Sequence, residues 1–145
     1  MEQIFTYDPQ SAGSKGLVYI GDKILIYRRD NKTKLFPLYL DLPGGGPEGT
    51  ETPFETFQRE VMEEFGLRVT PEDVVRAHTY QSTLEPTKPA YFIVVQLPAS
   101  TAKQIHFGDE GLEYMLLSPE DYLSRTDAWP AIQQRARDYI ASLSK

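Results

Sequence analysis

Three glutamates lie close together in the segment "REVMEEFG", residues 59–66. Glu60, Glu63 and Glu64 stand at i, i+3 and i+4, a spacing that brings side chains together on one face of a helix. Like charges at that spacing destabilise a helix by about 0.2–0.5 kcal/mol per pair. A bound cation would turn the repulsion into attraction, and sites made only of oxygen ligands suit Mg²⁺ or Mn²⁺, which often bind together with substrate phosphates.

An exposed, solvated helix face is the alternative interpretation, because surface glutamates are common in an acidic protein. Two features argue against it. The three carboxylates lie in the last two turns of the predicted helix, where the helix dipole disfavours negative charge. The segment "PGGGPEG" (43–49), too rich in glycine for regular structure, also leads into this helix, and its backbone can approach a ligand closely and offer carbonyl oxygens.

The helix that carries the glutamates has clear start and stop signals. Thr52 suits the N-cap, Pro53 suits the first helical position, and Glu55 completes a T-x-x-E capping box. Gly66 supplies the C-terminal stop. An apolar stripe at helical spacing predicts packing against a core, with the glutamates pointing away from it; its members are Phe54, Phe57, Val61 and Phe65.

The rest of the chain predicts a mixed sheet covered by helices. Residues 17–29 predict a β-hairpin, because two β-branched or aromatic runs flank Gly21-Asp22. Residues 11–16 predict a loop. Further strands are expected at 38–42, 74–82, 90–97 and 113–117. A capping-box pattern at 118–121 predicts the start of a short helix, and residues 130 to about 143 predict a terminal helix with an apolar stripe through Ile132, Ala136, Ile140 and Leu143.

Length and composition restrict the class of protein. A chain of 145 residues with 40% hydrophobic content predicts one domain over residues 1–145. The net charge of -6 and the pI of about 4.9 argue against broad attraction to DNA or to an anionic membrane. The chain has no cysteine, and neither a signal peptide nor an apolar run long enough to span a membrane is evident. We therefore expect a soluble, cytoplasmic protein.

The segment Gly45–Leu67 resembles the signature of the Nudix hydrolases at every specified position. The signature is Gly, five residues, Glu, seven residues, Arg-Glu, an aliphatic residue, any residue, Glu-Glu, any residue, Gly and an aliphatic residue. These positions fall on Gly45, Glu51, Arg59, Glu60, Val61, Glu63, Glu64, Gly66 and Leu67. The resemblance implies an α/β (α+β) fold of the Nudix type, an α/β/α sandwich with a mixed sheet between helices.

The resemblance also implies roles for the matching residues. Mg²⁺ or Mn²⁺ would be held by Glu60, Glu63, Glu64 and the carbonyl of Gly44. Glu60 is also a candidate base, and Arg59 and Glu51 resemble the family residues that brace it. The implied mechanism is attack of a metal-activated water on phosphorus without a covalent intermediate.

The family often adds one more acidic residue from a late loop or strand, as a ligand or as the base. Glu113 is the first choice here, because it shortly precedes "LLSPEDY", which resembles the family's passage from strand to helix. Glu110 is the second choice. An ordinary surface carboxylate is the alternative for each of them.

The implied reaction is cleavage of a pyrophosphate bond in a nucleoside diphosphate linked to another group. Arg28 and Arg29 are candidate contacts to substrate phosphate, although pairing with a surface carboxylate is an equal alternative. A nucleoside triphosphate or a dinucleoside polyphosphate is favoured slightly as substrate, and an RNA end stays open because of local basic residues. The alternative function is a catalytically inactive Nudix-fold module that binds nucleotides or regulates; the sequence leaves the oligomeric state undetermined.

Overall fold

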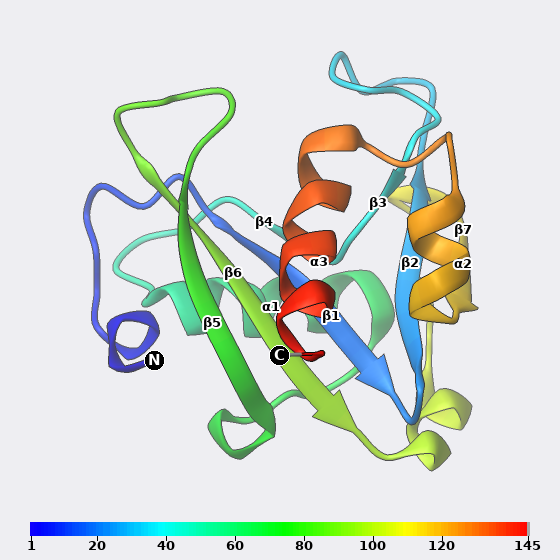
Figure 1. Cartoon of the computed structure of the whole chain (residues 1–145). Coiled ribbons are helices and arrows are strands. Elements are labelled where there is room, and N and C mark those ends of the chain that lie inside the picture. The colour runs from blue at the N-terminus through cyan, green and yellow to red at the C-terminus, as the bar shows by residue number, and fades with distance from the viewer. Residues whose placement is uncertain (145) are drawn as a thin grey trace.

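The predicted hairpin lies within a seven-stranded mixed sheet in the computed structural model, which describes residues 1–144 (Figure 1). The strand order is β3-β2-β1-β6-β5, with β4 paired to β1 and β7 paired to β2. Strands β1 and β6 pair in parallel, and the other pairs are antiparallel. The strands are β1 (Ser14–Ile20), β2 (Lys23–Arg29), β3 (Leu40–Asp41), β4 (Gly44–Gly45), β5 (Val74–Gln81), β6 (Pro89–Leu97) and β7 (Gly111–Leu117).

Helices cover both faces of this sheet, so the predicted α/β/α sandwich is confirmed. The α-helices are α1 (Pro53–Phe65), α2 (Pro119–Ser124) and α3 (Pro130–Ser142), and short 3₁₀-helices lie at Glu2–Phe5, Pro71–Asp73 and Ala99–Gln104. Figure 1 shows α1 behind the sheet and α3 in front of it. Alternate residues of the central strands fill two separate cores: Val18 packs with the α1 side and Leu17 with the α3 side.

Helix α1 begins and ends where its sequence predicts. The Thr52 hydroxyl accepts a hydrogen bond from the amide of Glu55, and the Glu55 carboxylate accepts one from the amide of Thr52 at 2.9 Å. Gly66 is the C-cap. The predicted apolar stripe is buried in the core, with Phe57, Val61 and Phe65 at 0% exposure.

The sequence misplaces two short segments that turn out to be strand. Residues 14–16, expected in a loop, form the start of β1, where Ser14 pairs with Tyr91 of β6. Gly44 and Gly45, expected in a turn, form β4 against β1. Small and glycine residues carry little strand propensity, so the pairing with neighbouring strands, a tertiary effect, decides these segments.

The remaining predicted elements are confirmed with small shifts of their ends. Helix α3 covers most of the predicted 130–143, but the last residue of its predicted apolar stripe, Leu143, lies beyond the helix and is exposed. Within residues 1–144, no helix is long and apolar enough to cross a membrane.

Candidate functional site

Three carboxylates meet at the C-terminal end of α1. Glu60, Glu64 and Glu110 each offer an oxygen that lies within 4.8 Å of the other two. Glu60 is half-buried, Glu110 is exposed, and Glu64 is only 7% exposed. The expectation that the helix carboxylates all point away from the core is therefore wrong for Glu64, whose position on α1 faces the edge of the sheet beside β4.

Glu64 is held in this buried position by the backbone of β4. The amide of Gly44 donates to Oε1 of Glu64 at 3.2 Å. Burial raises the pKa of Glu64 to about 8; the charge of Lys15 and the Gly44 amide oppose the rise, while the charges of Glu60 and Asp41 add to it. A carboxylate in this position is costly to ionise unless a cation approaches it.

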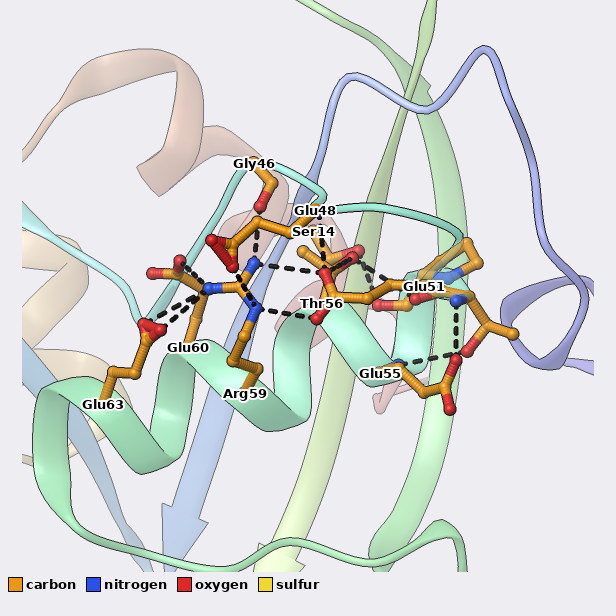
Figure 2. A network of polar contacts seen from close by, with 11 residues as sticks. Ser14, Gly46, Glu48, Glu51, Glu55, Thr56, Arg59, Glu60 and Glu63 are labelled. Atoms are coloured by element: carbon orange, nitrogen blue, oxygen red, sulfur yellow. Dashed lines mark hydrogen bonds and ion pairs between the residues drawn. The ribbon is translucent and has the colours of Figure 1, made fainter.

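Arg59 is the centre of a network of polar contacts that includes Glu60 (Figure 2). Its Nε donates to Oε2 of Glu51 at 2.7 Å, and its Nη1 donates to Oε1 of Glu60 at 2.8 Å. Nη1 also donates to Glu63 at 3.1 Å, and Nη2 donates to the carbonyl of Gly46 at 2.8 Å. One guanidinium thus fixes the side chain of Glu60 and the glycine-rich loop together.

Glu51 anchors this arginine. Its carboxylate accepts hydrogen bonds from the amide of Glu48 at 2.9 Å and from the hydroxyl of Thr56 at 3.1 Å, in addition to those from Arg59. Burial alone would raise the pKa of Glu51, but the hydrogen bonds from Arg59, Glu48 and Thr56 outweigh burial and lower it. Glu51 is therefore held as an anion, which fixes the orientation of the guanidinium.

Glu60 and Glu63 differ in burial and in their place relative to the cluster, although both contact Arg59. Burial raises the pKa of Glu60, Arg59 opposes this rise, and the charges of Glu63 and Glu110 add to it. The Glu63 side chain is 48% exposed and lies outside the group formed with Glu64 and Glu110. The structure therefore brings together two of the three predicted glutamate ligands, and metal binding by Glu63 stays a prediction.

The glycine at the start of the family signature allows Glu60 to reach its place. A Cβ built on Gly45 would lie 2.6 Å from Cδ of Glu60. Real Cβ contacts are never that short, so any side chain at position 45 would displace the Glu60 carboxylate. Gly44 contributes its amide to Glu64, and a ligand role for its carbonyl stays a prediction.

Glu110, the second choice for the late acid, joins the cluster, and Glu113, the first choice, does not. Glu113 lies on β7 opposite Arg28 of β2 and accepts from its Nε at 2.9 Å. Glu110 precedes β7, in a segment that runs along the end of α1, where the Gly108 amide donates to the carbonyl of Glu64 at 2.8 Å. This segment pairs the otherwise free carbonyls of the last helical turn and so places Glu110 beside Glu60 and Glu64.

The two predicted substrate arginines both have carboxylate partners. Arg28 pairs with Glu113 and with Asp127, which fits the alternative of a surface ion pair. Arg29 donates to Asp41 at 2.7 Å, and its guanidinium lies 5.0 Å from the centre of the Trp129 ring. Arg29 also lines a hollow of about 350 Å³ together with Glu110, whereas Arg28 does not.

A buried carboxylate that the sequence did not single out organises the basic groups. Asp41 is fully buried and pairs with Lys15 at 2.9 Å and with Arg29 at 2.7 Å. The hydroxyl of Tyr27 donates to the same oxygen at 3.2 Å. One negative charge between two positive ones leaves a net positive group beside the three glutamates.

The donor set of the cluster fits a hard divalent cation. It consists of three carboxyl groups that lie too close together to be ionised at once without a counter-charge. Glu64 is buried, and from residues 1–144 its carboxylate accepts a single hydrogen bond. Arg59, which donates to Glu60, also binds Glu51 and Glu63 of its network. Glu60, Glu64 and Glu110 are the residues that would hold such an ion.

The comparison with protein families agrees with this geometry. A family model described as NUDIX domain matches residues 14–139, which is most of the chain. The chain belongs to the Nudix family. Comparison with curated protein sequences gave no significant match.

Solved structures share the Nudix fold along nearly the whole chain. The MutT protein from Methanosarcina mazei Go1 has 21% identity and a TM-score of 0.74, covering 97% of this chain and 100% of its own. An Ap4A hydrolase from C. elegans has 16% identity and a TM-score of 0.68, covering 91% and 98%. The E. coli dihydroneopterin triphosphate pyrophosphohydrolase has 19% identity and a TM-score of 0.63, covering 94% and 99%.

Within the Nudix domain, sequence reasoning missed residues that lie outside the signature. Asp41 stands in the apolar strand segment "LYLDL", and an acid between two buried leucines is a signal that could have found it. Arg135 stands three residues after Ile132 and one before Ala136, so it shares the buried face of α3. Lys15 gives no comparable signal, because its segment predicts a loop.

Proposed function

We propose that this Nudix protein is a divalent-metal-dependent hydrolase that cleaves a pyrophosphate bond in a nucleoside diphosphate linked to another group. The observation that carries the proposal is the convergence of Glu60, Glu64 and Glu110 within 4.8 Å. Small nucleotides, nucleoside triphosphates and dinucleoside polyphosphates first among them, are the proposed substrates. The names of the structural neighbours, an Ap4A hydrolase and a triphosphate pyrophosphohydrolase, support this class. A cytoplasmic location stays a prediction from the sequence.

Mg²⁺ or Mn²⁺ bound to this cluster would supply positive charge to the phosphates and would lower the pKa of a bound water. The fixed positions of two of these carboxylates support this proposal. Arg59 holds Glu60 through Nη1, and the backbone of Gly44 holds Glu64. Little reorganisation of the side chains is needed when the ion and the substrate arrive.

Basic side chains next to the cluster suit the phosphates of a nucleotide. Lys15 is close enough for its charge to act on Glu64, and Arg29 and Lys32 line the hollow that also contains Glu110. Asp41 keeps Lys15 and Arg29 in place. These groups offset the negative charge of the phosphate chain locally, although the whole protein is acidic.

Glu60 is the proposed base. Its pKa is raised by burial, so its carboxylate accepts a proton more readily than an exposed glutamate does. The water that loses this proton attacks phosphorus; one P–O bond forms, and the anhydride P–O bond breaks, with the leaving phosphate taking the electron pair. Arg59 acts on this step as a positioning residue, because it orients the Glu60 carboxylate.

The test is hydrolysis of a nucleotide panel with Mg²⁺, with Mn²⁺ and with EDTA, followed by separation of the products. The panel contains nucleoside triphosphates, dinucleoside polyphosphates, nucleotide sugars, ADP-ribose, coenzyme A and capped RNA. We expect turnover of at least one small nucleotide that stops in EDTA. If the folded protein binds Mn²⁺ but hydrolyses nothing on the panel, the inactive binding module replaces this proposal.

Gly45→Ala is expected to weaken metal binding while the fold persists. The added methyl group displaces the carboxylate of Glu60. Because this carboxylate is the end of a flexible side chain, the substitution should weaken metal binding by the cluster more than it destabilises the fold. Mn²⁺ affinity, measured from the EPR signal of the free ion, should fall about 10- to 100-fold. Gly46→Ala is the matched control, because a Cβ at Gly46 meets no atom within 4 Å. Equal effects of the two substitutions would contradict this interpretation.

Glu110→Gln and Glu113→Gln should show which of these two glutamates takes part in metal binding. Glu110→Gln removes a carboxylate from the cluster and should lower Mn²⁺ affinity about tenfold. Glu113→Gln only weakens an ion pair with Arg28, in which the glutamate side chain is 54% exposed, so Mn²⁺ affinity should stay near that of the parent. A larger loss from Glu113→Gln in the same titration would reverse the assignment.

A further inference from the structure

A second cleft opens beside the acidic cluster, on the α3 side of the sheet. It has a volume of about 170 Å³, and its lining includes Lys15, Gly45, Leu84, Trp129 and Arg135. Gly45 joins it to the cluster, because a Cβ built on that glycine would overlap the Glu60 carboxylate. A ligand bound at the cluster can therefore extend into this cleft.

Arg135 lines the cleft without a counter-charge. It is 6% exposed, and in the part of the chain that the structure describes, no carboxylate lies within ion-pair distance of it. Its guanidinium lies 5.0 Å from the centre of the Tyr80 ring, and its hydrogen bond to the carbonyl of Gln81 is long, at 3.5 Å. A buried charge without a partner is costly, so the vacant donors of Arg135 indicate a ligand.

The unpaired nitrogens of Arg135 are not completely buried. Among residues 1–144, the Tyr122 hydroxyl is the only fully buried side-chain polar atom that lacks a hydrogen-bond partner. The free donors of Arg135 are therefore not sealed in the core. Arg135 is one of the residues that line the second cleft.

The cleft suits a nucleobase better than a phosphate. Its volume is below the roughly 300–1,000 Å³ of sites for drug-sized ligands, so it fits one planar ring system. Leu84, Tyr91, Trp129 and Ile132 offer apolar and aromatic surfaces, on which a base can pack. Lys15, whose charge acts on Glu64, is the basic group placed for phosphate, and Arg135 contacts none of the three carboxylates.

We propose that this cleft binds the base of the substrate and that Arg135 selects a 6-oxopurine, such as guanine, over adenine. The proposal rests on the proposed function, because it assigns the nucleoside end of that substrate. A guanidinium only donates hydrogen bonds. Guanine presents two acceptors, O6 and N7, on one edge, whereas adenine presents an acceptor beside an amino donor. Adenine would leave part of the Arg135 fork unpaired.

The test measures binding of GMP, IMP and AMP in EDTA through the fluorescence of Trp129, the only tryptophan of the chain. The three ligands carry the same phosphate, so differences between them report on the base. We expect GMP and IMP to bind roughly 5- to 150-fold more tightly than AMP. Arg135→Gln should shift the preference towards AMP, because a glutamine amide pairs with N6 and N7 of adenine.

Arg137→Gln is the matched control, since Arg137 lies on the same helix but is exposed and does not line the cleft. Arg135→Lys keeps the positive charge but removes the planar pair of donors of the guanidinium. This variant should lose most of the preference for GMP over AMP, while circular dichroism shows an intact fold. Equal binding of GMP and AMP by the parent, or equal effects of Arg135→Gln and Arg137→Gln, would overturn the proposal. Binding is measured without metal, so this test does not depend on catalysis. If the protein bound GMP selectively but hydrolysed no nucleotide, the proposed hydrolase activity would be refuted and the assignment of the cleft would still be supported.

Discussion

Glu64→Gln is expected to lower nucleotide turnover about 10²- to 10⁴-fold while the protein stays folded. The amide keeps the size of the side chain and can still accept the hydrogen bond from the Gly44 amide. It removes one of the three negative charges that converge in the cluster. The loss therefore falls on metal binding and on catalysis rather than on packing.

Mn²⁺ titration and product analysis at saturating metal separate these two losses. Glu72→Gln is the control, because Glu72 is an exposed glutamate on a 3₁₀-helix outside the site. It should leave turnover within about twofold of the parent, as expected for a surface substitution. Near-parental turnover of a folded Glu64→Gln protein would refute the role given to this residue.

The sequence predicts well those features that local chemistry decides. Thr52, Pro53 and Glu55 define the start of α1, and the spacing of Phe57 and Val61 defines its buried face. The hairpin and the late helix follow from equally local patterns. The family signature adds the identity of the acidic residues, because its spacing is fixed within one helix and the loop before it.

Features that depend on contacts between distant segments could not be predicted in this way. Glu110 reaches Glu64 only because the segment before β7 pairs with the end of α1 through the Gly108 amide. Glu113 looked better placed in sequence, but the register between β2 and β7 sets it opposite Arg28. No local pattern encodes either contact.

The sequence also does not predict which glutamate of the cluster is buried. Helical spacing places Glu60 and Glu64 on one side of α1, yet Glu64 is almost fully buried and Glu63 is exposed. The difference arises because β4 lies against this edge of α1 and presents the amide of Gly44 to Glu64. A pattern of charges does not show which member of the set a neighbouring strand will cover.

The burial of Glu64 makes the stability of the metal-free protein depend on pH. Its folded pKa, raised to about 8 by burial, exceeds the value of 4.5 expected for an unfolded glutamate. The folded state then binds more protons than the unfolded state between these values, so the contribution of Glu64 is most favourable below about pH 4.5 and is lost as the pH rises through about 8. At higher pH the buried charge destabilises the fold by an amount on the order of a few kcal/mol.

Glu64→Gln should therefore stabilise the metal-free protein at alkaline pH. In EDTA at pH 8.5 and above we expect a Tm roughly 5–10 °C above that of the parent, with the difference shrinking towards zero near pH 5. Saturating Mg²⁺ should reverse the order, because the ion stabilises only the protein whose carboxylates bind it well. Thermal unfolding of both proteins across this pH range, with and without Mg²⁺, measures the effect. A Tm difference that does not change with pH would mean that Glu64 ionises in the folded protein at no cost in stability. Its burial would then not lower the stability of the metal-free protein.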